Sequence, residues 1–375
     1  MILTGLIVGG ALGFALQRGR FCVTGAFRDV WVGRKTRWLT AFLVVVAVQS
    51  VGIFALDAAG VIELGAGELA PVATIVGAFI FGFAIVLAGG CATGTFYRSS
   101  EGLIGSWFAL IFYAGFAAIM KYGVFADLTA AARAQTVPVT TIHDSLGISP
   151  WWLVGILVAA VGWATYRHLS AEPSTVLATL PPRRSGLARI LFEKPWHAFG
   201  TAVVIGVIAI VAWPLSTAAG RPSGLGITTP SANLVNFLVT GDVELVDWGV
   251  MLILGILVGA FIAAKGSGEF RLRVPDTTTL VRSISGGALM GVGASLAGGC
   301  TIGNAMVGTA QFSYQGWLSL IFMILGTGAA THVFILRHRG SAATAGAGVG
   351  GTAGSAGATA GGAGDAGGGK VLTNA

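Results

Sequence analysis

The chain contains three cysteines, and two of them lie in a duplicated motif. Cys91 and Cys300 each follow the string Leu-Ala-Gly-Gly, and a glycine comes three residues later, at Gly94 and Gly303. The third cysteine, Cys22, lies near the start of the chain. A thiol is a weak hydrogen-bond donor with a soft, polarisable sulfur, so several thiols along a path could bind a small sulfur-bearing anion and still release it. The wide spacing of the cysteines gives neither a CxxC redox motif nor a zinc site.

The glycines before each of these two cysteines predict a break in a helix. Gly89-Gly90 and Gly298-Gly299 lie at the ends of long apolar runs, where residues without Cβ allow a sharp turn. A new helix would follow, with Thr93 or Thr301 near its cap, and its free N–H groups and partial positive charge favour an anion. At membrane depth such a break is tolerated only inside protein or beside a hydrated path. We therefore predict that the two loops line a path for an anion.

A related pattern contains Cys22 and is partly repeated later in the chain. Gly19-Arg20-Phe21-Cys22 has a weak counterpart in Gly220-Arg221-Pro222-Ser223, which retains Gly-Arg and replaces the cysteine by serine. Arg20 has two interpretations. Its guanidinium helps an anion leave towards the cytoplasm, or it anchors the first apolar segment at the membrane interface.

The predicted substrate-binding residues are therefore Cys22, Cys91, Cys300, Gly89, Gly90, Gly94, Gly298, Gly299, Gly303 and Arg20. The sequence predicts no catalytic residue and no metal site, because its five histidines are scattered and form neither a ligand set nor a nucleophile–base pair. A phosphate-binding glycine loop with its lysine is not found in the sequence, which argues against transport driven by ATP. We predict a protein that is not an enzyme and needs no cofactor.

The composition indicates the class of protein that must position these residues. Of 375 residues, 54% are hydrophobic and only 10% are charged, and the mean hydropathy is +0.82. A soluble domain carries about 25% charged residues. The chain is therefore predicted to be an all-α polytopic membrane protein. The formal net charge of +7 does not indicate a nucleic-acid partner, because basic residues accumulate on the cytoplasmic side of such proteins.

About nine apolar segments of roughly 16–21 residues suit a hydrocarbon core about 30 Å thick. They lie at 2–17, 38–56, 72–90, 102–120, 151–166, 198–215, 248–264, 284–299 and 316–336, and contain no Lys, Arg, Asp or Glu. Nearly all of the 22 basic residues lie in alternate connections between these segments. The positive-inside rule then places the N-terminus outside the cell and the C-terminus in the cytoplasm.

The repetition extends beyond the cysteine motif. Trp107-Phe108-Ala109-Leu110-Ile111-Phe112 follows Cys91, and Trp317-Leu318-Ser319-Leu320-Ile321-Phe322 follows Cys300. Segments 1–4 would thus match segments 6–9, and the odd number of spans between the copies would invert the second one, as in many transporters. We predict one transporter domain, 1–339, with halves at about 1–120 and 198–339 joined by the span at 151–166. Residues 340–375 are rich in Gly and Ala and are predicted to form a disordered cytoplasmic tail.

The motif set resembles the YeeE/YedE sulfur-transport family, and most closely its bacterial thiosulfate-uptake members. The resemblance rests on Gly19-Arg20-Phe21-Cys22-x-x-Gly25-Ala26 together with the two Gly-Gly-Cys-x-x-Gly loops. It implies a helical protein of the bacterial inner membrane, surrounded by lipid, in which short re-entrant helices converge at the centre. It also implies that thiosulfate is handed inward past Cys300, then Cys91, then Cys22, and that a small cytoplasmic sulfur-carrier protein can be a partner.

Two other functions remain open from the sequence. The transporter could carry another sulfur or selenium oxyanion, such as sulfite. A membrane thiol–disulfide oxidoreductase is a hypothesis of a different class, and it requires two of the three thiols to interconvert with a disulfide. The lack of a CxxC motif argues against it.

Overall fold

The computed structural model describes residues 1–171, 185–193 and 196–336, and in these ranges its regular secondary structure is helical, with three isolated β-bridges in the connections. The long helices are α1 (Leu3–Gly19), α3 (Arg37–Ala58), α4 (Pro71–Leu87), α6 (Ile104–Tyr122), α9 (Pro150–Ser170), α11 (Ala198–Ala218), α13 (Trp248–Ser267), α14 (Thr277–Ala297) and α15 (Tyr314–Thr331). The shorter ones are α2 (Val23–Gly33), α5 (Ala92–Ser100), α7 (Ala126–Ala134), α8 (Ile142–Leu146), α10 (Gly186–Ala188), α12 (Thr228–Thr240) and the 3₁₀ or π turns η1 (Arg189–Glu193), η2 (Val243–Leu245), η3 (Gly303–Gly308) and η4 (His332–Leu336).

Nine stretches within the described ranges are long and apolar enough to cross a membrane, which confirms the predicted all-α polytopic class. The helix ends differ from the predicted segments. α14 begins at Thr277 rather than at 284 and includes Arg282, and α4 ends at Leu87 rather than at 90. Helices extend past the hydrocarbon core where a long cation can reach the interface, and this explains Arg282. The predicted tail, 340–375, lies outside the described residues.

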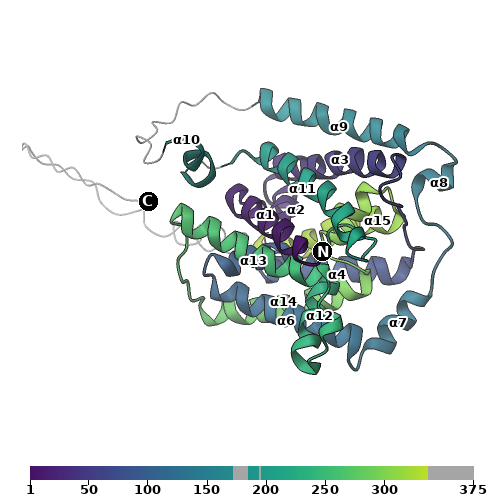
Figure 1. Ribbon diagram of the computed structural model, residues 1–375. Coiled ribbons are helices and arrows are strands. Elements are labelled where there is room, and N and C mark those ends of the chain that lie inside the picture. The colour runs from purple at the N-terminus through teal and green to yellow at the C-terminus, as the bar shows by residue number, and fades with distance from the viewer. Residues whose placement is uncertain (172–184, 194–195, 337–375) are drawn as a thin grey trace, which may run out of the picture.

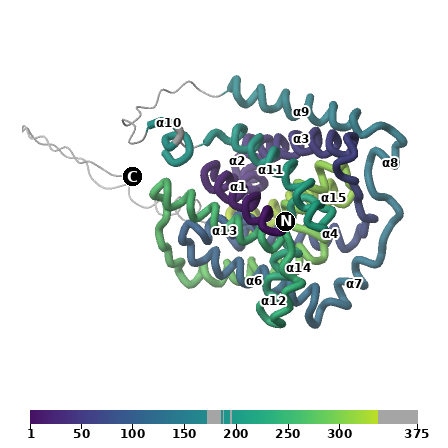
Figure 2. Tube along the Cα trace, viewed as in Figure 1, coloured from purple at the N-terminus to yellow at the C-terminus, as the bar shows by residue number. Residues whose placement is uncertain are grey.

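The helices pack into one bundle with α9 on its outside. Figure 1 shows α9 along the outer side of α3, with α8 near one end of α9 and α10 near the other. The tube in Figure 2 shows α1 beside α13, although the two are far apart in the chain. Glycines permit the closest helix approaches, because they bring one backbone against another. Gly9 of α1 faces Leu252 of α13, and Gly82 of α4 faces Met323 of α15.

The helix pairs exchange partners between the two predicted halves. α1 packs on α13 and α3 packs on α11, while α6 packs on α14 and α15 packs on α4. Suppose that α1, α3, α4 and α6 correspond in this order to α11, α13, α14 and α15. The α1–α13 pair then maps onto the α11–α3 pair, and the α6–α14 pair maps onto the α15–α4 pair. α4 and α14 pack on each other and map onto themselves. Such an exchange is what a two-fold relation would produce, and the inversion of the repeat across the membrane stays a prediction.

Short helices follow α1, α4, α11 and α14, the four helices that end at a predicted loop. α5 shows best why such a helix needs the surrounding bundle. All but one of its nine residues are buried, although it contains Thr93, Thr95, Ser99 and Ser100. Buried hydroxyls need local acceptors, and those of Thr95, Ser99 and Ser100 each donate to a backbone carbonyl oxygen within α5. The fold therefore places a polar helix at the centre of an apolar bundle.

Candidate functional site

Both Gly-Gly-Cys loops break the helix that precedes them. α4 ends at Leu87 and Gly89 has φ +69°, while α14 ends at Ala297 and Gly298 has φ +75°. Glycine adopts this left-handed backbone conformation without the steric cost of a Cβ. A new helical segment follows each loop, α5 after the first and η3 after the second. The predicted helix breaks are confirmed in both copies of the motif.

The N-cap of α5 is Cys91, and Thr93 lies in the first turn, near the cap as predicted. The Cys91 sulfur accepts a hydrogen bond from the Gly94 N–H at 3.4 Å. The Thr93 hydroxyl is buried and has no hydrogen-bond partner in the described structure, and the same holds for Thr24, two residues after Cys22. An unpaired buried polar group costs about 1–3 kcal/mol. These two hydroxyls are therefore buried donors with free hydrogen-bonding capacity, each two residues after a cysteine.

The structure brings Cys22 and Cys91 together. Cys91 is buried in the first loop, and Cys22 is half-buried at the start of α2; both are free thiols. A Cβ placed on Gly94 would lie 3.6 Å from the Cys22 sulfur and 3.5 Å from the Cys91 sulfur. Thr301, which follows Cys300 in the second loop, is close enough to Cys91 to affect the electrostatics of its thiol, and its buried hydroxyl has no hydrogen-bond partner in the described structure. The first loop therefore lies against Cys22 and near the second loop.

Cys300 is fully buried beside a cavity of about 220 Å³, which we call the Cys300 cavity. Tyr113 of α6 lies near this thiol, and its hydroxyl donates a hydrogen bond to Thr228 Oγ1 at 2.9 Å. Arg221 lines the cavity and donates a hydrogen bond to the Gly224 carbonyl oxygen at 3.0 Å. Burial lowers the pKa of the Arg221 guanidinium. Ser223, the predicted counterpart of Cys22, lines the same cavity.

A second cavity, of about 170 Å³, adjoins Cys22; we call it the Arg20 cavity. Its lining residues are Arg20, Tyr97, Arg98, Glu101, Glu269 and Arg273. Arg98 Nη2 donates to the Cys22 sulfur at 3.7 Å, and Nη1 donates to the Gly89 carbonyl oxygen. Burial is the main cause that raises the pKa of the Glu101 carboxyl. Arg98 thus connects Cys22 with the cavity and holds the first loop.

Sequence reasoning missed Arg98. The available signal was a lone arginine in a short polar segment directly after the Cys91 motif. Such a cation is equally typical of the membrane interface, because the local sequence does not determine which way a long side chain points. Its contacts with Cys22 and with the first loop come from packing α5 against the start of α2.

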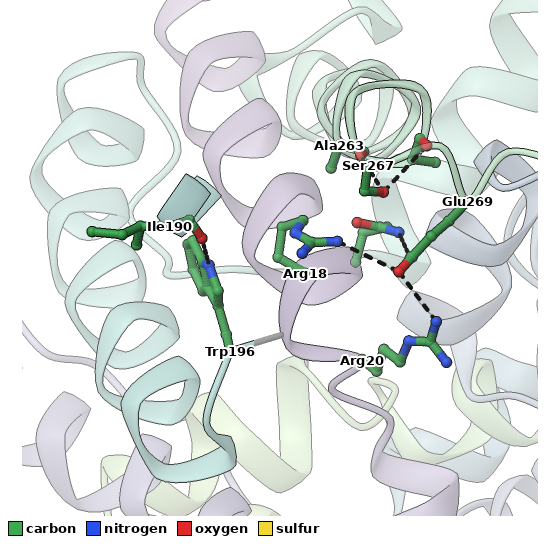
Figure 3. A network of polar contacts seen from close by, with 9 residues as sticks. Arg18, Arg20, Ile190, Trp196, Ala263, Ser267 and Glu269 are labelled. Atoms are coloured by element: carbon green, nitrogen blue, oxygen red, sulfur yellow. Dashed lines mark hydrogen bonds and ion pairs between the residues drawn. The ribbon is translucent and has the colours of Figure 1, made fainter. Parts of the chain in front are cut away.

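Arg20 lies at the rim of the cavity that carries its name. Its side chain is 73% exposed, and Nη2 lies 3.2 Å from Glu269 Oε1. Figure 3 shows the Glu269 carboxylate between the guanidinium groups of Arg20 and Arg18, and Arg18 Nη1 lies 3.6 Å from the same oxygen. Arg20 therefore faces a charged cavity, and its part in releasing an anion stays a prediction.

The second loop is held by the side chains of an asparagine, a glutamine and an arginine. Asn304 Nδ2 donates to the Ala297 carbonyl oxygen at 2.7 Å, and Gln315 Nε2 donates to Asn304 Oδ1 at 3.2 Å. Arg133 of α7 donates from Nη1 to the Leu296 carbonyl oxygen at 3.1 Å. A cation at this position pairs with the free carbonyl groups at the end of α14. Burial lowers the pKa of the Arg133 guanidinium.

The remaining predicted glycines have different surroundings. A Cβ on Gly299 would stand 2.6 Å from Asn304 Oδ1, so packing requires glycine there. Gly303 lines the Cys300 cavity, and a Cβ on it would meet nothing within 4 Å. A Cβ on Gly90 would lie 3.5 Å from the Gly94 backbone, an ordinary contact. The ten predicted site residues thus divide between the two loops, Cys22 and the Arg20 cavity.

Alanine at the two left-handed glycines should separate backbone strain from loop packing. Either substitution, Gly89→Ala or Gly298→Ala, puts a Cβ on a left-handed residue, which costs roughly 1–2 kcal/mol. A Cβ on Gly89 meets nothing within 4 Å, whereas one on Gly298 collides with the Arg133 guanidinium. We expect Gly298→Ala to lower the midpoint of thermal unfolding in detergent more than Gly89→Ala does. Equal midpoints would show that Arg133 does not support the second loop.

Comparison with known proteins gives one consistent result. The family model described as "Sulphur transport" matches residues 18–329. The thiosulfate transporter TsuA of Escherichia coli is 51% identical over 337 residues, which cover 90% of this chain and 96% of that protein. The thiosulfate transporter TsuA of Spirochaeta thermophila is 34% identical over 342 residues, 87% of this chain and 97% of that protein. A probable transporter of E. coli, YedE, is 38% identical over 104 residues, 27% of this chain and 25% of that protein.

Proposed function

The chain belongs to the sulphur transport family, and on that premise we propose that it carries thiosulfate across the bacterial inner membrane into the cytoplasm. The anion passes the thiols of Cys300, Cys91 and Cys22 in that order. The N-terminus lies outside and the C-terminus in the cytoplasm, as the distribution of basic residues indicates. A small cytoplasmic sulfur-carrier protein is a proposed partner that would receive the cargo.

One arrangement carries the proposal. Cys91 lies beside Cys22, because a Cβ on Gly94 would stand 3.5 Å from the Cys91 sulfur and 3.6 Å from the Cys22 sulfur. Thr301, next to Cys300, is close enough to affect the electrostatics of the Cys91 thiol. An anion that leaves the Cys300 cavity would therefore pass Cys91 and then Cys22. A thiol is a weak hydrogen-bond donor and holds an anion loosely, which suits passage rather than storage.

Arginines at both cavities supply the attraction that the thiols lack. Arg221 lines the Cys300 cavity, and Arg20 and Arg98 line the Arg20 cavity. Arg20 and Arg221 occupy matching Gly-Arg positions of the two predicted halves. Guanidinium groups recognise oxyanions through paired N–H donors. A divalent anion is thus favoured at each end and is loosely held between them.

The exchange of helix partners between the halves supports an inverted repeat. In that arrangement the two loops would enter from opposite faces of the membrane and approach each other near its midplane. Inverted-repeat transporters bind their cargo there. The influence of Thr301 on the electrostatics of the Cys91 thiol is in keeping with loops that lie close together.

The proximity of Cys22 and Cys91 is the observation that would favour a thiol–disulfide oxidoreductase. The family and the similar proteins are named for transport, and this argues that Cys22 and Cys91 are successive binding positions on one transport path rather than a redox pair. Sulfite or a selenium oxyanion remains a second proposed cargo. Each would compete with labelled thiosulfate if it used the same thiols.

Uptake of radiolabelled thiosulfate into liposomes tests the proposed function. Liposomes that contain the purified protein should accumulate label over time, and protein-free liposomes should not. An inside-negative potential should slow entry, because a dianion moving inward meets about 4.6 kcal/mol per 100 mV. Imposing a proton gradient then shows whether protons offset that cost. Absence of uptake by protein that elutes as a single species in detergent would reject thiosulfate transport.

A further inference from the structure

The Arg20 cavity contains more cations than a passing anion needs. Arg20, Arg98 and Arg273 line it, and the carboxylates of Glu101 and Glu269 oppose them. Three guanidinium groups around a small cavity would bind a divalent oxyanion and keep it, because each offers several N–H donors. Release therefore depends on what the two carboxylates do.

Glu269 is fixed in place by residues that an anion does not displace. Gln17 Nε2 donates to Glu269 Oε2 at 2.7 Å, and the Gln17 side chain is fully buried. Arg18 Nη1 lies 3.6 Å from Oε1, and its side chain is only 3% exposed. The carboxylate is thus held at the cavity from the α1 side, as Figure 3 shows.

Arg20 is the opposite case. Its ion pair with Glu269 spans 3.2 Å, but 73% of the Arg20 side chain is exposed. An exposed ion pair contributes little, because water screens it and a long side chain loses conformational freedom. Arg20 can therefore leave Glu269 for a stronger partner at small cost. A divalent anion is such a partner.

Arg98 connects this cavity with the thiols. Its guanidinium contacts the Cys22 sulfur and also lines the cavity. An anion that leaves Cys22 would therefore meet Arg98 first and could then draw Arg20 away from Glu269.

We infer that the Arg20 cavity is a release site for a small divalent oxyanion, in which Glu269 competes with the anion for Arg20 and so promotes its release. This inference rests on the proposed transport of thiosulfate. Glu269 is a positioning residue here, since it acts on the anion through Arg20. Its carboxylate weakens binding at the last step and thereby speeds turnover.

The test compares Glu269→Gln with the wild-type protein and with Glu244→Gln, an exposed carboxylate on η2 that does not line the cavity. With the competitor neutralised, purified Glu269→Gln should bind labelled thiosulfate about two- to fivefold more tightly, the range expected when one exposed charge pair is lost. In liposomes its maximal uptake rate and its half-saturating concentration should both fall. Glu244→Gln should leave binding and uptake unchanged.

A second variant keeps the inference testable if Glu269→Gln does not fold. Arg20→Gln removes the exchangeable cation, so it should bind thiosulfate more weakly than the wild-type protein does. Wild-type binding by folded Glu269→Gln, or by Arg20→Gln, would overturn the release site. If the wild-type protein takes up no thiosulfate at all, the proposed function fails, while the binding comparison still decides whether Glu269 competes at this cavity.

Discussion

Replacement of Cys91 by alanine is expected to reduce thiosulfate uptake by at least about tenfold, because it removes the donor at the junction of the two loops. A hydrogen bond to a charged group contributes about 1.5–3 kcal/mol, and about 1.4 kcal/mol corresponds to a factor of ten. Cys91 is buried at the N-cap of α5, and the neighbouring Cys22 thiol is already engaged by the Arg98 guanidinium. Cys300→Ala should reduce thiosulfate uptake by a similar factor, since Cys300 is buried at the Cys300 cavity. The measurement is initial uptake rate into liposomes at matched protein content.

Cys91→Ser is the matched control for packing. Serine is close in size to cysteine and retains a donor, but it lacks the soft sulfur. If Cys91 only fills space, serine and alanine should both transport thiosulfate at nearly the wild-type rate. We expect serine to retain more uptake than alanine and less than the wild-type protein. Wild-type uptake rates in all three single variants, Cys22→Ala, Cys91→Ala and Cys300→Ala, would reject a path along the thiols.

Alanine at Gly9 is expected to disrupt the fold more than any change at the protein surface. Gly9 of α1 lies so close to α13 that a Cβ would stand 2.8 Å from the Leu252 carbonyl carbon. A backbone atom cannot rotate away, so the helices must separate, and overpacking of this kind costs about 1–3 kcal/mol. α1 also carries Gln17, Arg18 and the turn to Arg20, so their contacts with Glu269 should be lost with it.

The control for Gly9→Ala is Gly155→Ala in α9. A Cβ on Gly155 meets nothing within 4 Å, and alanine stabilises a helix by roughly 0.5–1 kcal/mol relative to glycine. Thermal unfolding followed by tryptophan fluorescence in detergent should show a lower midpoint for Gly9→Ala and an unchanged or higher one for Gly155→Ala. The same midpoint for both variants would mean that the close approach of α1 and α13 adds nothing to stability.

Much of the architecture could be predicted from local sequence, because the membrane makes local pattern decisive. A run of apolar residues in lipid must form a helix that pairs its own backbone groups, so the segments could be placed by composition alone. The breaks at Gly89 and Gly298 were predicted on the same ground, since glycine pairs without Cβ permit a left-handed turn. The helix ends were placed less well, as Thr277 of α14 shows, because a helix continues past the apolar run into the interface.

The residues around the thiols follow a different rule. Arg98, Arg133 and Glu269 lie in segments whose patterns are those of ordinary surface connections. Arg133 reaches Leu296 and Glu269 reaches Arg18, across more than half the chain in the second case. A long side chain can point in many directions, and only the packing of distant helices selects one of them.

The sequence by itself thus determined the class of protein, the two broken helices and the thiols that distinguish them, because each depends on residue types that are neighbours in the chain. Only the tertiary structure decided that Cys22 stands beside Cys91 and that Arg98 joins them to a cavity. The tertiary structure also decided that Glu269 pairs with Arg20 at the rim of the Arg20 cavity. These contacts depend on the close approach of α1, α5 and α13, which is set by backbone packing between helices that no local pattern encodes.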